Sequence, residues 1–132
     1  MEKVLRDTDI SLRVLQVLME ASYDSILVTD ATKTAKIIYA NSAFKTLTGY
    51  APSEVIGKTP RILQGPGTDR KVIARLGKVL KKSGKFEGRA INYKKDGTPF
   101  IMYWRVLPVK VANQTRLWIA IQREGSAITR NR

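Results

Sequence analysis

The sequence predicts an α+β fold, with a five-stranded antiparallel sheet, short helices on one of its faces and a flanking helix at the N-terminus. Three observations predict it. Two segments repeat apolar residues at helical spacing, five short segments are rich in β-branched and aromatic residues, and turn residues separate them. In chain order the expected elements are a helix, two strands, short helices, a longer helix and three strands, an order typical of an α+β sandwich.

The N-terminal part of the chain predicts one helix and a pair of strands. Residues 9–22 repeat Leu, Val and Met at helical spacing, and Asp9 or Ser11 can cap this helix. Residues 25–30 and 36–40 have the composition of strands, and a loop of hairpin length separates them. The apolar face of the helix must pack against something, either this domain or the same helix of a second chain.

Two short helices are predicted next. Asn41 is a good N-cap for residues 41–48, and Gly49 suits the position after the helix end. A single helical turn starts at Pro52 and stops before Gly57. We expect both short helices to cover one face of the sheet.

The C-terminal half predicts one longer helix and three strands. Residues 69–82 combine an apolar stripe with a basic face that we expect to be solvated. Strands are expected over residues 86–94, 100–110 and 116–123, and a Lys-Asp-Gly turn marks the first two as a hairpin. The concave face of such a sheet, covered by the short helices, is a natural pocket for a small ligand.

The missing residue types restrict the function. The 132 residues include no cysteine and no histidine. This excludes disulfides and thiolate chemistry, and it removes the commonest metal ligands and the usual general base. We therefore expect a sensory or binding module without a metal rather than an enzyme, and an effector enzyme outside this chain is compatible with that. No apolar run approaches the roughly 18 residues of a membrane span, and the N-terminus lacks a signal-peptide core, so we expect a cytoplasmic protein.

The formal net charge is +13, and it is unevenly distributed. Residues 1–30 hold three basic and six acidic residues, net −3, which leaves +16 on the remainder. We expect residues 1–22 to form a cap or dimerisation arm, residues 23–124 the domain, and residues 125–132 a linker or tail. No nucleic-acid-binding motif accompanies the charge, so a nucleic-acid partner is not expected. A steep salt dependence of DNA binding would support the alternative, a domain that binds nucleic acid by charge alone.

The most informative motif is the octet at residues 57–64, Gly-Lys-Thr-Pro-Arg-Ile-Leu-Gln. It resembles the flavin-cradling motif of light-oxygen-voltage (LOV) sensors, a branch of the PAS family, whose pattern is G-x-N-C-R-F-L-Q. Two further motifs occur in the family's order, Tyr-Ala-Asn-Ser-Ala-Phe at residues 39–44 and Asn-Tyr-Lys-Lys-Asp-Gly at residues 92–97. The likeness covers about residues 20–124 and implies a PAS fold and a role in sensing and signal transduction.

The resemblance implies a flavin held without a covalent bond, FMN in the simplest case, with FAD, riboflavin or no cofactor as alternatives. By analogy with LOV domains, Arg61 would pair with the flavin phosphate, and Gln64 would lie beside the chromophore. Asn92 would bind the pyrimidine edge of the ring, and Gln122 would contact N5 and O4 and transmit the signal. Amide side chains match the donors and acceptors of a flavin edge, and the Arg fork matches a phosphate.

Several positions depart from the LOV pattern. Pro60 replaces the photoreactive cysteine, so no cysteinyl adduct can form, and the signal would be a redox or hydrogen-bond change. Thr59 and Met102 replace asparagines, and the second phosphate-binding arginine falls at Gly77, with Arg75 as a nearby substitute. The residues predicted to line the cofactor site are Asn41, Thr59, Pro60, Arg61, Gln64, Arg75, Asn92, Met102 and Gln122.

A second interpretation is a PAS domain without flavin, which serves dimerisation or binds another small ligand. Pro60, Ile62 and Met102 favour it, because they make the predicted pocket more apolar than a flavin site should be. Under either interpretation the expected partners are a second copy of the chain, met through the N-terminal helix or the sheet, and a downstream effector domain or protein. No contact with a membrane is expected.

Overall fold

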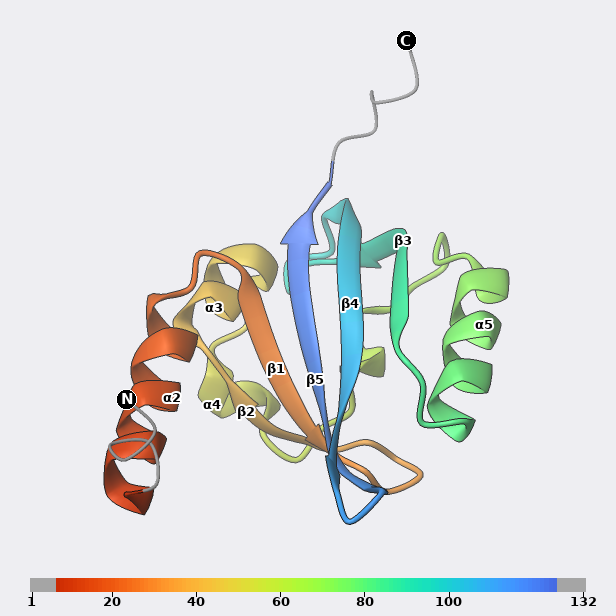
Figure 1. Cartoon of the computed structure of the whole chain (residues 1–132). Helices are drawn as coiled ribbons and strands as arrows, with labels where there is room; N and C mark the ends of the chain where they lie inside the picture. The colour runs from red at the N-terminus through yellow and green to blue at the C-terminus, as the bar shows by residue number, and fades with distance from the viewer. Residues whose placement is uncertain (1–6, 126–132) are drawn as a thin grey trace, which may run out of the picture.

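The computed structural model describes residues 7–125 and contains one sheet flanked by helices (Figure 1). Its elements in chain order are α2 (Thr8–Ala21), β1 (Ser25–Asp30), β2 (Ile37–Ala40), α3 (Ser42–Thr48), α4 (Pro52–Val55), the 3₁₀ helix η1 (Pro60–Leu63), α5 (Arg70–Lys81), β3 (Phe86–Tyr93), β4 (Pro99–Val111) and β5 (Gln114–Glu124). Every predicted helix and strand is present, with ends that agree to within two residues. The turn η1, which lies inside the octet, was not predicted.

The strands lie in the order β2-β1-β5-β4-β3, and every neighbouring pair is antiparallel. This confirms the predicted five-stranded antiparallel sheet. The last strand, β5, lies in the middle of the sheet, so Gln122 is paired with Ser25 on one side and with Trp104 on the other. The end of the domain is thereby hydrogen-bonded to its beginning, directly after α2.

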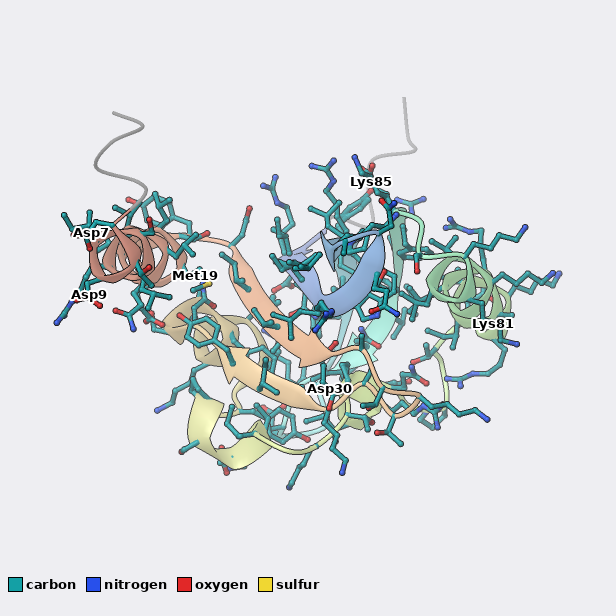
Figure 2. The ribbon with its side chains drawn as sticks, turned by 60° about the horizontal axis from the view of Figure 1, so that its bottom comes forward. Asp7, Asp9, Met19, Asp30, Lys81 and Lys85 are labelled. Atoms are coloured by element: carbon teal, nitrogen blue, oxygen red, sulfur yellow. The ribbon has the colours of Figure 1, made fainter. Side chains whose placement is uncertain are left out.

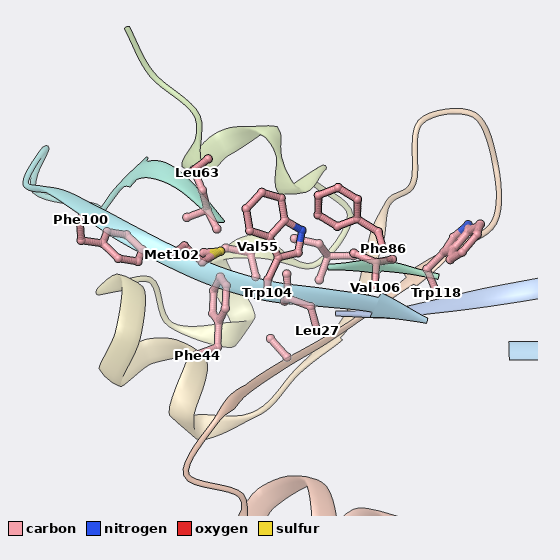
Figure 3. Packing of buried hydrophobic residues seen from close by; sticks show 13 residues of the cluster. Leu27, Phe44, Val55, Leu63, Phe86, Phe100, Met102, Trp104, Val106 and Trp118 are labelled. Atoms are coloured by element: carbon pink, nitrogen blue, oxygen red, sulfur yellow. The ribbon is translucent and has the colours of Figure 1, made fainter. Parts of the chain in front are cut away.

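One face of the sheet carries the core. Along β4, the alternate residues Phe100, Met102, Trp104 and Val106 are buried, as the two-residue period of a strand requires. They pack with residues of α3, α4, η1 and the apolar side of α5 (Figure 3). The short helices therefore cover one face of the sheet, as the sequence predicts, and they enclose the space where a ligand would lie.

Side-chain caps determine where the helices start. Asp7 accepts hydrogen bonds of 3.0 and 3.2 Å from two backbone amides of the first turn of α2. The predicted caps Asp9 and Ser11 are therefore wrong, because both residues lie inside the helix. Asn41 caps α3 as predicted, and Gly49 ends that helix in the left-handed conformation, with φ of 83°.

The helix α2 lies at one side of the molecule and α5 at the opposite side (Figures 1 and 2). No residue of α2 is buried. Six of its large apolar side chains are 39–65% exposed: Ile10, Leu12, Val14, Leu15, Val17 and Leu18. Within residues 7–125, no helix has both the length and the hydropathy needed to cross a membrane.

Candidate ligand-binding site

The octet folds into a tight turn against the core. Thr59 caps η1 by accepting a hydrogen bond of 3.3 Å from the amide of Arg61. Pro60 occupies the first helical position, where a missing N–H leaves no hydrogen bond unmade. Leu63 is buried in the core, whereas the Arg61 side chain is exposed. The octet therefore turns its apolar residues toward the sheet and its cation toward solvent.

The turn after the octet is anchored to β3. The Thr68 hydroxyl donates to the carbonyl of Ile91 (2.7 Å) and accepts from the amide of Gly65 (3.0 Å). The ring of Tyr93 lies so close to Gly65 that an added β-carbon would be 2.4 Å from it. Only glycine fits at this position, and these contacts hold the octet in place over the sheet.

Gln122, on β5, is buried at the centre of the sheet and is 3% exposed. Its amide oxygen accepts a hydrogen bond of 3.0 Å from the hydroxyl of Ser25, which is also buried. The amide nitrogen makes no hydrogen bond within residues 7–125, and Gln122 lines a small cavity. The side chain therefore presents an unused donor to whatever the cavity holds.

Asn92 is buried on β3, beneath the octet. With its nitrogen turned toward η1, its amide donates to the carbonyls of Leu63 and Ile91, both at 3.2 Å. The sulfur of Met102 lies beside the same amide, on the neighbouring strand. The structure brings Asn92 and Met102 together, but neither is among the residues that line the cavity at Gln122.

The cavity at Gln122 has a volume of about 90 Å³. It is enclosed by the sheet, the octet, α5 and the loop before β2. Its lining residues are Thr29, Ala35, Pro60, Leu76, Leu80, Trp104, Val106, Trp118, Ala120 and Gln122. None of these side chains titrates near neutral pH, so the cavity walls supply neither an acid nor a base.

Aromatic side chains fill much of the space next to the cavity. The rings of Trp104 and Phe86 pack with their centroids 5.2 Å apart and their planes at 43° (Figure 3). The guanidinium of Arg75 lies over the Phe86 ring, 4.6 Å from its centroid, and donates to the carbonyl of Glu87 (3.2 Å). Arg75 is therefore engaged with β3, which corrects the prediction that it is available to a phosphate.

Gln64 and Arg61 lie outside the cavity. The amide oxygen of Gln64 accepts a hydrogen bond of 3.1 Å from the guanidinium of Arg70, the first residue of α5. Arg61 is exposed, and neither Arg61 nor Gln64 is among the cavity-lining residues. Their predicted roles toward a flavin remain predictions.

Asn41 is completely buried, and its amide has no remaining hydrogen-bonding capacity. The oxygen accepts from the amides of Ile26 (2.9 Å) and Phe44 (3.2 Å). The nitrogen donates to the carbonyls of Met19 (2.7 Å) and Asp24 (3.0 Å). An asparagine amide offers two donors and two acceptor sites, so all are used. The prediction of Asn41 as a cofactor-binding residue is corrected: it joins α2, β1 and α3.

Sequence reasoning missed two residues that shape the site, Ser25 and Phe86. A serine at the start of an apolar strand is compatible with many roles, and only the pairing of β1 with β5 places it against Gln122. Phe86 was predicted only as the start of a strand, and its contact with Trp104 depends on the pairing of β3 with β4. Both signals are long-range, so a local pattern could not have found them.

The comparisons with known proteins agree with the fold. The family model of the PAS domain matches residues 24–126. The chain belongs to the PAS domain family. This PAS chain is 41% identical over 107 residues to phototropin-2 of Oryza sativa subsp. japonica, which covers 80% of the chain but 12% of phototropin-2. It is 47% identical over 77 residues to a blue-light-activated histidine kinase of Brucella anthropi, covering 58% of the chain and 16% of the kinase. The chain thus spans a small part of each relative.

A solved structure places the likeness in the LOV branch. The LOV domain from the Erythrobacter litoralis EL346 blue-light activated histidine kinase superposes with a TM-score of 0.73 at 31% identity, covering 76% of this chain and 94% of that one. The PAS fold and the likeness to LOV domains, both predicted from the sequence motifs, are confirmed. The chain differs from the LOV pattern in having no cysteine.

The cavity does not fit a flavin in this conformation. Pockets for drug-sized ligands span roughly 300–1,000 Å³, and a protein cavity of about 150 Å³ holds benzene. The cavity at Gln122 measures about 90 Å³, whereas a flavin has three fused rings. A flavin could enter only if the Trp104 indole, which forms part of the wall, moved away.

A larger hollow of about 680 Å³ lies on the outer face of the sheet, opposite the helices. Side chains of that face such as Tyr103, Arg105, Ile121 and Arg123 line it, and none of the predicted cofactor-site residues does. Its size does not make it the site, because it is a groove on the exposed side of the sheet and the octet contributes nothing to it.

Proposed function

We propose that the chain is a sensory PAS module that detects a compact ligand in the cavity at Gln122 and reports it through α2. One observation carries the proposal: the Gln122 amide is bonded through its oxygen to Ser25 while its nitrogen faces the cavity without a partner. A buried donor without a partner costs about 1–3 kcal/mol, so a ligand that brings an acceptor gains a hydrogen bond of matching value.

The route from the cavity to α2 consists of consecutive contacts. Gln122 holds Ser25, and the carbonyl of the preceding residue, Asp24, accepts a hydrogen bond from Asn41. The same Asn41 amide nitrogen donates to Met19 in the last turns of α2. A rotation of the Gln122 amide toward a ligand would loosen Ser25 and shift the residues that hold α2. The signal would therefore be a change in the position of α2.

The ligand fits a restricted chemical description. The walls are mostly apolar, the volume is about 90 Å³, and Gln122 offers a donor. These features favour a molecule smaller than benzene that carries at least one hydrogen-bond acceptor. The cavity walls contain no nucleophile or general base, so binding rather than turnover is the supported role.

The output would act on a second copy of the chain and on an effector elsewhere in a longer protein. The six exposed apolar side chains of α2 support pairing with a second copy. The relatives are several times longer than the region that this chain matches, which supports a fused effector. We place the dimer contact at α2, with the outer face of the sheet as the other surface available to it.

Flavin sensing without a covalent adduct is the second candidate. The octet, Asn92 and Gln122 favour it, because their order matches that of LOV domains and both amides are buried on the helix-covered side of the sheet. It requires Trp104 to leave the wall of the cavity. FMN is then the expected flavin, and FAD is the alternative because Arg75 is engaged elsewhere.

The absorption spectrum of the purified protein, before and after addition of FMN, separates these two candidates. We expect no flavin band near about 450 nm and no quenching of added FMN fluorescence. A yellow protein, or one that takes up FMN, would contradict the compact-ligand proposal and establish flavin sensing.

The variant Trp104→Ala sharpens the test. Removing the indole enlarges the cavity, so this variant should bind FMN where the wild type does not, at a cost of about 3–5 kcal/mol in stability. Trp104→Leu provides a milder substitution if the first fails to fold. Phe100→Ala, a core aromatic that does not line the cavity, is the matched control and should lose stability without gaining FMN binding.

A further inference from the structure

The helix α5 and the residues that follow it carry a dense group of cations. Between residues 70 and 86, seven side chains are basic and none is acidic. All seven are exposed: Arg70, Lys71, Arg75, Lys78, Lys81, Lys82 and Lys85. Figure 2 shows Lys81 projecting from the outer side of α5, at the edge of the molecule away from α2.

Three of these cations form a row along the solvent side of the helix. Lys71, Lys78 and Lys82, the last at the C-cap, are seven and four residues apart, which places them on one face. The row extends over about 16 Å, a length over which B-DNA presents roughly ten phosphate charges. A β-carbon added at Gly77, between them, would meet no atom within 4 Å, so the helix backbone is open to a partner here.

These charges are not neutralised by the protein. The four ion pairs found within residues 7–125 involve the cations Lys94, Lys95, Arg105 and Arg123, and none involves a basic residue of α5. The two arginines of α5 are instead used in hydrogen bonds, Arg70 to Gln64 and Arg75 to the carbonyl of Glu87. The lysines therefore remain as point charges directed at solvent.

The chemistry of this face narrows the kind of partner. Among the described residues, none of the exposed large hydrophobic side chains lies on α5. An anionic membrane or a protein interface would call for such anchors. The face also has no Asn or Gln, and both arginines are engaged, so it lacks the usual readers of base edges. What remains is recognition of a regular polyanion by lysine charges alone.

We propose that α5 binds the phosphate backbone of duplex DNA without reading its base sequence. An α-helix with its side chains is about 10–12 Å across and fits the B-DNA major groove, which is about 12 Å wide. The major groove of A-form RNA is too narrow for it. The absence of a known binding motif made this partner unexpected from the sequence. The arrangement of the lysines on a helix at the edge of the molecule supplies the reason to propose it.

The test measures binding of the wild-type chain to a fluorescent duplex of about 20 base pairs, of mixed sequence, as salt rises from about 50 to about 200 mM. Four or more phosphate contacts should weaken binding about a hundredfold over this range. The triple variant K71Q/K78Q/K82Q should bind at least about tenfold more weakly at low salt and should flatten the salt dependence by about three contacts.

The control K33Q/K45Q/K110Q removes the same charge from exposed lysines away from α5. It should bind the duplex almost as well as the wild type. Equal weakening by both triple variants would overturn the proposal, because the attraction would then be diffuse. A duplex RNA of the same length that binds as tightly as DNA, or polyglutamate that competes equally at equal charge, would overturn it too, the latter indicating an acidic protein partner. The wild type failing to bind DNA at low salt would end it.

Discussion

The hydrogen bond between Ser25 and Gln122 links the candidate site to the start of the domain. Both residues are almost inaccessible to solvent, so neither the hydroxyl nor the amide oxygen can exchange this bond for one to water. The antiparallel pairing of β1 with β5 places the two residues directly opposite each other. A ligand that engages the amide nitrogen of Gln122 therefore acts on a group whose other end is already committed to β1.

The variant Ser25→Ala should destabilise the domain by about 1–3 kcal/mol, because it leaves the buried amide oxygen of Gln122 without a donor. Denaturant unfolding monitored by tryptophan fluorescence measures the loss. Ser53→Ala, at an exposed position of α4, should change stability much less. Equal stability of the two variants would mean that another group replaces the serine hydroxyl, and the route from Gln122 to α2 would lose its first step.

Individual site residues were predictable only as far as local motifs reach. The positions of Pro60 and Gln122 follow from the order of the motifs, and the structure places both at the same cavity. The roles of Asn41 and Arg75 depend on partners from other elements, such as Met19 for Asn41 and Phe86 for Arg75. No sequence pattern encodes such partners, because they are brought together by the packing of the sheet and the helices.

The C-terminal end of α2 is fastened to the domain by polar contacts rather than by apolar packing. Glu20 accepts hydrogen bonds from the hydroxyl of Tyr39, on β2, and from the amide of Ser42, at the start of α3. Asn41 adds the hydrogen bond to Met19. Polar contacts of this kind can be broken at a modest cost, and we infer that they allow α2 to move as a unit.

The contact with Glu20 should make stability depend on pH at high pH. Burial, then the hydrogen bond to and the charge of Glu20, raise the pKa of Tyr39 to about 12, from a model value of 10.0. A raised folded-state pKa means that this contribution to stability is complete below pH 10 and is lost as the pH rises toward 12. Tyr39→Phe should lack this contribution, and Glu20→Gln should reduce it.

Urea unfolding of the wild type and both variants at several pH values between 9 and 11.5, about the range of tyrosine ionisation, measures this difference. Absorbance of the ionised phenol gives the pKa directly in the difference between the wild type and Tyr39→Phe. Identical pH dependence of stability in the wild type and Tyr39→Phe would show that Glu20 and Tyr39 do not hold α2 to the domain.

Secondary structure was predicted well because its signals are local. The alternation in β4 and the helical spacing in α2 and α5 each extend over many residues, so the type of element was clear. The 3₁₀ turn η1 was missed because four residues are too few for a period to appear. The cap of α2 was misplaced because Asp7, Asp9 and Ser11 are all acceptable caps, and only the backbone conformation selects one.

The molecule as a whole separates its two unsatisfied surfaces. The apolar side chains of α2 lie uncovered at one side, and the basic face of α5 lies at the other (Figures 1 and 2). The fold class was evident from the order of elements. The volume of the cavity was not, because it depends on how Trp104 packs against Phe86 from a different strand. The closed cavity and open α2 face together favour a module whose output is assembly.

If α2 is the contact between two copies, charges placed on its apolar side should separate them. We expect the wild type to be a dimer and Leu15→Glu/Leu18→Glu a monomer, because each substitution would bury an unpaired carboxylate in the interface. Size-exclusion chromatography with light scattering measures the mass. Arg13→Gln/Gln16→Glu changes the net charge equally on the same helix and should remain dimeric. A wild type that is monomeric at every concentration contradicts the dimer, and a Leu15→Glu/Leu18→Glu variant that stays dimeric moves the contact from α2 to the outer face of the sheet.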